Sequence, residues 1–232
     1  MIFVISIITF LVSMFVSWKL KSKFQEYSEI GLQSGLSGRE VAERMLRDNG
    51  IYDVQVISVE GQLSDHYNPA NKTVNLSHDV YYGRSAASVA VAAHECGHAV
   101  QHATGYAALN LRSALVPIQS VSANVLNVIM LISIFGGMFL YKAFPIQQVL
   151  ILIICCHGVI TLFSLITLPV EFDASSRALA YIDRKGIVTS REHAMAKDAL
   201  QWAAATYVVA ALGSLAQLLY YVSLLMGMRR DD

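Results

Sequence analysis

The sequence predicts a mainly α-helical integral membrane protein with about four transmembrane helices and a small β-hairpin or sheet beside a helix that carries a His-Glu-x-x-His motif. Three observations support this fold class. The chain of 232 residues is 55% hydrophobic and only 15% charged, which is too apolar for an ordinary soluble domain. Four long apolar runs interrupt it, each near the length that crosses a bilayer. Between the first two runs, short segments bounded by turn residues are typical of strands.

The first apolar run covers residues 2–18, which is long enough to span a bilayer with a thin margin. Lys19, Lys21 and Lys23 follow this run, whereas a signal peptide carries its positive charges before the apolar region. We therefore expect an uncleaved transmembrane anchor with its N-terminus outside. A cleaved signal peptide is the alternative.

The polar region after this anchor predicts one short helix and three strands. Ser37 and Glu40 have the spacing of a capping box at the start of an amphipathic helix, and Gly50 follows its end. Strands are expected at residues 54–59, 63–67 and 73–76. The last two are joined by the turn-forming residues Asn-Pro-Ala-Asn, which predicts a β-hairpin.

A helix over residues 85–103 carries the motif as His94, Glu95 and His98, with Ser85 as its N-cap. Residues four apart share one face of a helix, so both imidazoles can reach one metal ion. Glu95 lies about 100° around the helix from His94 and can face a water on that ion. Two nitrogen ligands, an open metal position and a carboxylate base are what amide hydrolysis by zinc requires.

The remaining apolar runs cover residues 120–141, 146–168 and 203–226. The tight connection at 142–145 predicts that the second and third runs are antiparallel neighbours, and the polar segment between the third and fourth runs is expected to be helical with a break at Gly186. The resulting division is an N-terminal anchor (1–18), a region with the hairpin and motif helix (19–118), a transmembrane helical hairpin (119–168), a helical region (169–202) and a C-terminal transmembrane helix (203–228).

Charge distribution predicts the orientation of these spans. The lysines and arginines of 19–118 and 169–202 outnumber Lys142, Arg229 and Arg230, so the positive-inside rule places both polar regions in the cytoplasm. The two terminal arginines argue slightly against this orientation, and the fourth run could instead lie against the bundle. Labelling of a single cysteine near Asn71 only from outside would exclude the cytoplasmic assignment.

Two histidines do not complete a hydrolytic zinc site, and Glu171 is the candidate for the third ligand. It follows the third apolar run directly, on the same predicted side as the motif helix, and a carboxylate so close to a span is costly unless it is paired or bound to metal. Asp173 is the rival ligand but faces another side of a helix. A solvated Glu171 at a helix start is the plain alternative.

Three segments together resemble the YugP-type neutral zinc metallopeptidases of bacterial membranes. They are residues 65–69 (Asp-His-Tyr-Asn-Pro), 94–101 (His-Glu-Cys-Gly-His-Ala-Val-Gln) and 167–175 (Thr-Leu-Pro-Val-Glu-Phe-Asp-Ala-Ser), and the match extends to Tyr207. This family resembles, more distantly, the membrane gluzincins, in which an aspartate stands four residues after the third-ligand glutamate. Ser175 occupies that place here, which leaves open which group orients the histidines.

The resemblance and the motif together imply a membrane-embedded zinc endopeptidase with one Zn²⁺ per chain. His94, His98 and Glu171 would hold the ion, and Glu95 would act as general base on a zinc-activated water. The substrate would be a polypeptide, which could itself be membrane-associated. It would pair with an edge strand at 63–67 or 73–76. The expected location is a bacterial cell membrane, with the site on the cytoplasmic face.

Two other classes of protein remain as alternatives. A non-catalytic membrane scaffold with a structural metal would need a fourth protein ligand, such as His66 or Asp173. A metal-free ion-pair cluster is the second. Balanced charge, with 17 basic and 17 acidic residues, and the lack of a basic stripe indicate no nucleic-acid partner. Three cysteines without a disulfide pattern fit a reducing compartment.

Several further residues have both a functional and a structural interpretation. His102 extends the histidine series, but it lies roughly 6 Å further along the axis, so a surface position is preferred. His66 and Tyr67 could stabilise an oxyanion or pack as strand residues. His157 falls within a span, where a helix–helix hydrogen bond is preferred to a relay or second metal site. Cys96 is expected to face away from the metal and to serve packing.

Overall fold

The structure, a computed structural model, describes residues 1–135 and 145–228. It divides into two compact units. The site unit consists of Phe15–Asn110 and Leu168–Thr206, and the span unit consists of Met1–Met14, Leu111–Thr167 and Tyr207–Asp232. Both units are mainly helical, and the sheet lies in the site unit.

Four long helices confirm the predicted spans: α1 (Ile2–Ser28), α5 (Ala107–Phe135), α7 (Ile146–Arg184) and α8 (Ser190–Met228). Each contains an apolar stretch sufficient to cross a membrane. All four are longer than the apolar runs, since polar turns extend them without a break; α7, for example, continues past the third apolar run through Pro169 to Arg184. Residues 136–141 of the second predicted run, the predicted connection at 142–145 except for Pro145, and the pair Arg229 and Arg230 lie outside the described residues.

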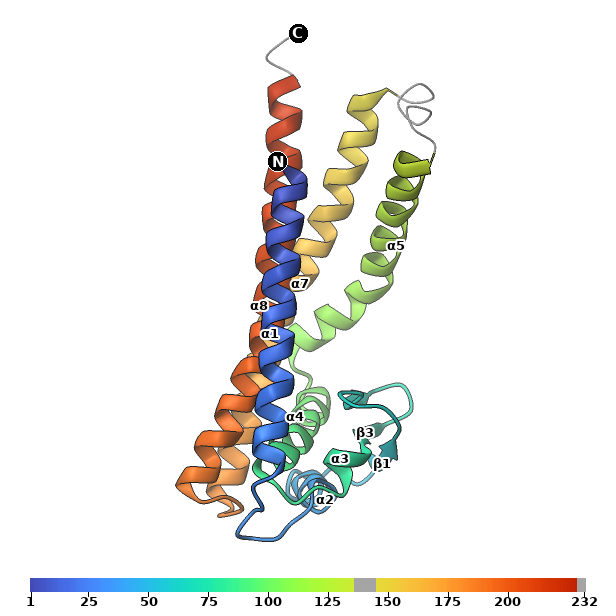
Figure 1. Ribbon diagram of the computed structural model, residues 1–232. Coiled ribbons are helices and arrows are strands. Elements are labelled where there is room, and N and C mark those ends of the chain that lie inside the picture. The colour runs from blue at the N-terminus through green and yellow to red at the C-terminus, as the bar shows by residue number, and fades with distance from the viewer. Residues whose placement is uncertain (136–144, 229–232) are drawn as a thin grey trace. The chain divides into compact units, whose positions relative to one another are not determined.

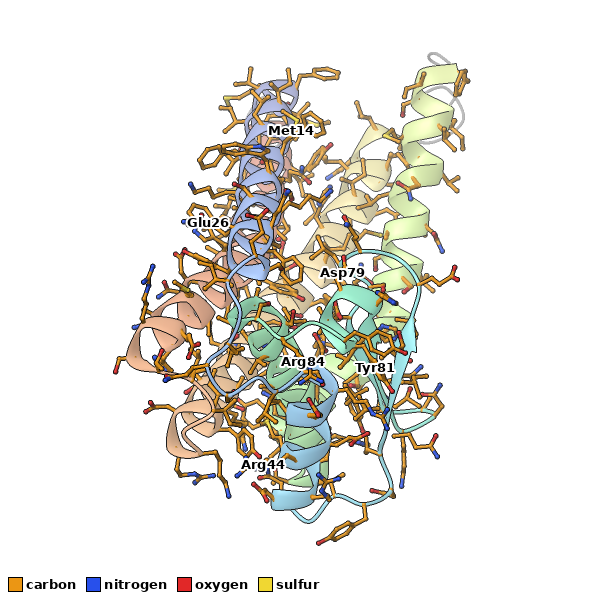
Figure 2. All side chains as sticks on the ribbon, turned by 60° about the horizontal axis from the view of Figure 1, so that its bottom comes forward. Met14, Glu26, Arg44, Asp79, Tyr81 and Arg84 are labelled. Atoms are coloured by element: carbon orange, nitrogen blue, oxygen red, sulfur yellow. The ribbon has the colours of Figure 1, made fainter. Side chains whose placement is uncertain are left out.

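The outer surface of the span unit is apolar. Phe3 and Phe10 of α1 are 79% and 64% exposed, and similar side chains project along α5. In Figure 2 the part of α1 around Met14 carries mainly carbon-only side chains, whereas nitrogen and oxygen atoms become common near Glu26. Exposed apolar area of this extent is costly in water and suits a lipid environment.

The short helix α2 (Gly38–Asp48) begins and ends as its sequence predicts. The Ser37 side chain accepts a hydrogen bond from the Glu40 backbone, and the Glu40 carboxylate accepts one from the Ser37 backbone. Such a reciprocal cap satisfies two of the four free N–H groups at a helix start. Gly50 follows with a φ of +71°, the left-handed conformation that terminates helices.

The sheet contains β1 (Gln55–Val59), β2 (His66–Asn68) and β3 (Thr73–Ser77) in the order β1-β3-β2. β2 and β3 pair antiparallel and form the predicted hairpin, although β2 begins at His66 rather than at residue 63, and β1 pairs with β3 in parallel. The interpretation of 73–76 as a possible edge strand is therefore wrong: β3 is central and all five of its residues are buried. A parallel pairing between segments about 18 residues apart leaves no local pattern in the sequence.

The motif helix α4 (Ala86–Ala103) lies at the centre of the site unit. The Ser85 side chain caps it by accepting from the Ser88 backbone, as predicted. It packs against α2, the small helix α3 (His78–Tyr81) and the sheet; in Figure 1 α2 lies below α4, and α3 and the strands lie to one side of it. Fourteen of its 18 residues are buried, so small alanines and Gly97 dominate its sequence.

Candidate metal centre

The structure brings His94, His98 and Glu171 together. Glu171 Oε2 lies 3.4 Å from His94 Nε2 and 3.6 Å from His98 Nε2. One donor atom from each of the three side chains lies within 4.8 Å of the others. The side chains are 12%, 9% and 3% exposed, in the order His94, His98, Glu171. Both histidines come from α4 and the glutamate from α7, segments that are more than 70 residues apart in the chain.

Gly97 allows α4 and α7 to approach closely enough for this cluster. A Cβ atom at Gly97 would lie 2.7 Å from the carbonyl oxygen of Ala174 and 3.1 Å from its Cα. Both atoms belong to the backbone of α7, so neither can rotate away. The glycine inside the motif is therefore required by helix packing rather than by a turn.

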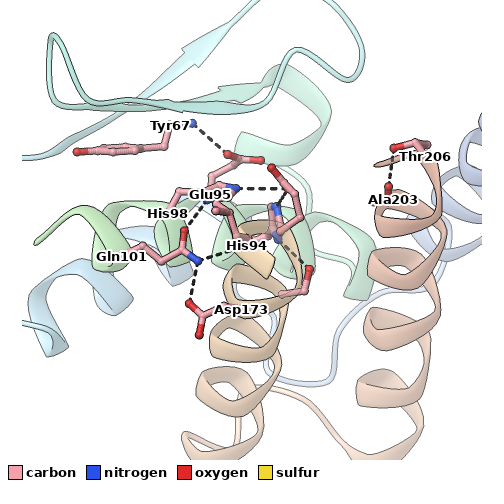
Figure 3. A network of polar contacts seen from close by, with 11 residues as sticks. Tyr67, His94, Glu95, His98, Gln101, Asp173, Ala203 and Thr206 are labelled. Carbon is pink, nitrogen blue, oxygen red and sulfur yellow. Dashed lines mark hydrogen bonds and ion pairs between the residues drawn. The ribbon is translucent and has the colours of Figure 1, made fainter. Parts of the chain in front are cut away.

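His98 is oriented by Gln101, which lies one turn further along α4. His98 Nδ1 lies 2.9 Å from Gln101 Oε1. Gln101 Nε2 in turn donates to the Val170 carbonyl and to Asp173 Oδ2, both at 2.8 Å. Arg177 donates to the same carboxylate oxygen at 2.6 Å. The chain of contacts thus runs from the His98 imidazole into α7, as Figure 3 shows for the labelled residues.

His94 has a simpler partner. Its Nδ1 lies 3.1 Å from Ser175 Oγ. The sequence analysis left open which group orients the histidines, and the hydroxyl of Ser175 is the group that contacts His94. The two imidazole rings stand nearly perpendicular, with centroids 4.8 Å apart and an interplanar angle of 83°. Each ring therefore uses Nδ1 for a protein contact and turns Nε2 toward Glu171.

Glu95 lies beside the cluster and is not part of it. One of its carboxylate oxygens accepts a hydrogen bond from the backbone N–H of Tyr67 at 3.0 Å. Glu95 is 8% exposed, and Figure 3 shows it between β2 and the two histidines. The hairpin that supplies this N–H is itself held by Asp65, which accepts from the Ser77 backbone and hydroxyl at 2.7 and 3.1 Å.

Electrostatics at the cluster favour positive charge. Burial lowers the pKa of His98, but its hydrogen bond to Glu171 and the charges of Glu95 and Glu171 raise it by more, so that pKa lies above its usual value.

Burial raises the pKa of the Cys96 thiol, and its Sγ contacts the Ala42 carbonyl of α2 at 3.5 Å. Cys96 therefore faces packing, as predicted, and stays a neutral thiol.

The other singled-out residues do not join the cluster. His102 is exposed and its Nδ1 lies 2.8 Å from the Tyr67 hydroxyl, which turns that hydroxyl along α4 toward His102. His66 is exposed with Nδ1 on the Ser64 carbonyl, and Asp173 is engaged by Gln101 and Arg177. Among the described residues, neither candidate for a fourth ligand of a structural metal is grouped with the three.

The donor set fits zinc. Two imidazoles and one carboxylate are ligands that Zn²⁺ accepts in hydrolytic sites, where three protein groups leave one position open. Glu171 carries a negative charge at a position that is almost fully buried, and such a charge needs a cation or a charged partner. The sequence analysis did not predict the roles of Gln101 and Gly97. The position of Gln101 three residues after His98, on the same helix face, was the signal that could have indicated its role.

Comparison with known proteins gives concordant results. The sequence profile of the family described as "Putative neutral zinc metallopeptidase" matches residues 2–226. The "Putative membrane protease YugP" of Bacillus subtilis (strain 168) is 42% identical over 220 residues, which cover 95% of this chain and 94% of that protein. No solved structure matches the chain.

Proposed function

Since the chain belongs to the family described as "Putative neutral zinc metallopeptidase", we propose that it is a membrane-embedded, zinc-dependent endopeptidase that hydrolyses peptide bonds. The single observation that carries the proposal is the grouping of two imidazoles and one carboxylate with a separate carboxylate at its side. His94, His98 and Glu171 would hold one Zn²⁺. The ion would supply Lewis-acid activation of water and polarisation of the scissile carbonyl.

Glu95 has the position of a general base. The hydrogen bond from the Tyr67 N–H holds the Glu95 carboxylate beside the three proposed ligands and not among them. The carboxylate therefore remains available to take a proton from the attacking water. The same carboxyl group would then deliver that proton to the leaving amine nitrogen. A base held by a backbone N–H in the middle of a short strand needs no large reorganisation before the reaction.

The proposed substrate is an extended polypeptide segment, and β2 is the strand that would receive it. β2 is an edge of the sheet, whereas β3 is paired on both sides. Tyr67 donates its N–H to Glu95 rather than to β3, so its backbone faces the metal centre. Addition of a substrate strand at this edge would bring a peptide bond toward Glu95. Because β2 has three residues, only a short stretch of the substrate around the cleaved bond would pair with it.

We also propose that this chemistry takes place at the cytoplasmic face of a bacterial membrane. Four apolar helices support insertion. Phe15, Trp18 and Trp202 form an aromatic group in the site unit, with Lys19 Nζ 6.0 Å from the centroid of each tryptophan ring. Such groups are typical of the membrane–water interface. The excess of lysine and arginine in 19–118 and 169–202 supports the cytoplasmic side.

The test of the enzymatic proposal compares wild type with Glu95→Gln, both purified in detergent with measured zinc content. An unfolded protein serves as substrate, and self-cleavage is followed in parallel. Loss of a general base lowers turnover by about 10²–10⁴-fold, so cleavage should fall below detection while zinc content stays equal. Glu192→Gln is the matched control, because Glu192 is 7% exposed and caps α8 through Thr189.

Three outcomes separate the alternatives. Cleavage by wild type and Glu192→Gln, lost in an equally zinc-loaded Glu95→Gln, supports the peptidase with Glu95 as base. Full activity of Glu95→Gln excludes this mechanism. Equal zinc with no cleavage by any variant favours the structural-metal scaffold over the enzyme.

A further inference from the structure

The side-chain amide of Gln101 has an orientation that chemistry determines. Its nitrogen faces the Val170 carbonyl and the Asp173 carboxylate, both at 2.8 Å. These two partners can only accept hydrogen bonds, so the group between them must be the NH₂ donor. The opposite orientation would place the amide oxygen against two further oxygens while the side chain is fully buried. Gln101 Oε1 is consequently the atom that faces His98.

An amide oxygen accepts hydrogen bonds and cannot donate them. His98 Nδ1, 2.9 Å away, must therefore carry the proton of this contact. In a neutral imidazole one nitrogen is the donor and the other has the lone pair, so the lone pair of His98 lies on Nε2. That nitrogen is the one that faces Glu171.

His94 offers a built-in comparison. Its Nδ1 contacts the Ser175 hydroxyl, which can rotate and serve either as donor or as acceptor. The Ser175 hydroxyl is therefore compatible with both tautomers of His94, whereas the Gln101 amide is compatible with only one tautomer of His98.

Resting on the zinc site of the proposed function, we propose that Gln101 is a positioning residue that selects the Nδ1-protonated tautomer of His98 and couples it to α7. Asp173 acts through Gln101, since it accepts from the amide nitrogen and is itself fixed by Arg177. The amide contacts the carbonyl of Val170, the residue directly before Glu171. One side chain thus aligns a ligand on α4 with the ligand on α7, and the expected result is tighter zinc binding.

The experiment uses the full chain in detergent and the variant Gln101→Met, which keeps length and loses all three hydrogen bonds. Zinc dissociation constants are measured by competition with a chromophoric chelator. Tautomers are measured on the zinc-free protein at alkaline pH from the ¹⁵N shifts of labelled histidine side chains. Losing the partner of a metal-bound histidine costs about 10–100-fold in metal affinity, and we expect zinc binding to weaken by that factor. His98 should also lose its single Nδ1–H form.

Thr104→Val is the matched control, because Thr104 ends the same helix and donates to the backbone carbonyls of Val100 and Gln101 without contacting His98 or the Gln101 side chain. It should keep the wild-type dissociation constant and tautomer. If Gln101→Met does not fold, Asp173→Leu gives the test in milder form: it removes one of the two acceptors, and zinc binding should weaken by a few-fold. Wild-type zinc affinity together with an unchanged His98 tautomer in the folded variant overturns the proposal.

These measurements are independent of catalysis. If Gln101→Met weakens zinc binding and loses the single Nδ1–H form of His98 while wild type cleaves nothing, the positioning inference stands and the proposed peptidase fails. If wild type cleaves and Gln101→Met leaves zinc affinity and tautomer unchanged, the reverse holds.

Discussion

The site unit and the span unit differ in what several of their polar side chains do. In the site unit, polar side chains connect different elements: Gln101 and Ser175 join α4 to α7, and Glu95 joins α4 to β2. In the span unit, Ser133 and Ser164 donate to the carbonyl four residues earlier in their own helix. Local hydrogen bonds leave the helix surface apolar, as lipid requires. Hydrogen bonds between different elements instead fix the positions of those helices and strands relative to one another, as a catalytic site requires.

The two units also differ in what their glycines accommodate. Gly97 in the site unit faces the backbone of Ala174, whereas Gly213 in the span unit faces the side chain of Thr9, whose Cγ2 would lie 2.5 Å from an added Cβ. Backbone cannot move without shifting a whole helix, but a methyl group can be displaced more easily. The site unit is therefore expected to tolerate far less change than the span unit.

The largest effect is expected from Glu171→Ala. The variant removes one of three grouped ligands, and losing only the partner of a ligand already costs about 10–100-fold, so zinc affinity should fall by more than about 100-fold. Metal analysis of the purified protein measures this. Cys155→Ala, an exposed position in the span unit, is the control and should retain zinc. Full zinc occupancy in Glu171→Ala would contradict the three-ligand assignment.

Gly97→Ala should be next in magnitude. The added methyl group meets Ala174 backbone and must separate α4 from α7, and overpacking of this kind costs about 1–3 kcal/mol. Alanine gains about 1 kcal/mol of helix propensity over glycine, so the clash must exceed that gain for a net loss. Thermal unfolding in detergent and zinc content should both decrease. An alanine variant as stable and as zinc-loaded as wild type would show that α4 and α7 do not pack this closely.

Ser175→Ala should have a smaller effect that is confined to His94. A neutral hydrogen bond contributes about 0.5–1.5 kcal/mol, so zinc should bind about 2–10-fold more weakly, with the fold otherwise intact. The chelator competition that measures Gln101→Met measures this variant as well. A loss larger than that of Gln101→Met would reverse the ranking of the two histidine partners.

Local patterns in the sequence predicted the site unit in part. The four-residue spacing predicted the shared face of His94 and His98, and the position of Glu171 just after a span selected it as third-ligand candidate, a role that stays a prediction. The capping box of α2, the N-cap of α4 and the end of α2 at Gly50 were confirmed because they depend on neighbours a few residues away.

The missed features all depend on contacts between distant segments. Gln101 has a role only because α7 places Val170 and Asp173 opposite it, 69 and 72 residues later. β3 is central only because β1 pairs with it in parallel. Helix register and non-local strand pairing are set by packing of the whole unit, which a single sequence does not display locally.

Gly213→Ala should have the smallest effect and completes the comparison with Gly97. The new methyl group meets the end of the Thr9 side chain, which can adopt another rotamer, and helix propensity gains about 1 kcal/mol in compensation. The net change in unfolding free energy should therefore lie within about 0.5 kcal/mol of zero, with zinc content unchanged. Thermal unfolding of both alanine variants, side by side, is the measurement. If Gly213→Ala destabilised the protein as much as Gly97→Ala, close helix packing would be equally strict in both units, and the tolerance assigned to the span unit would be wrong.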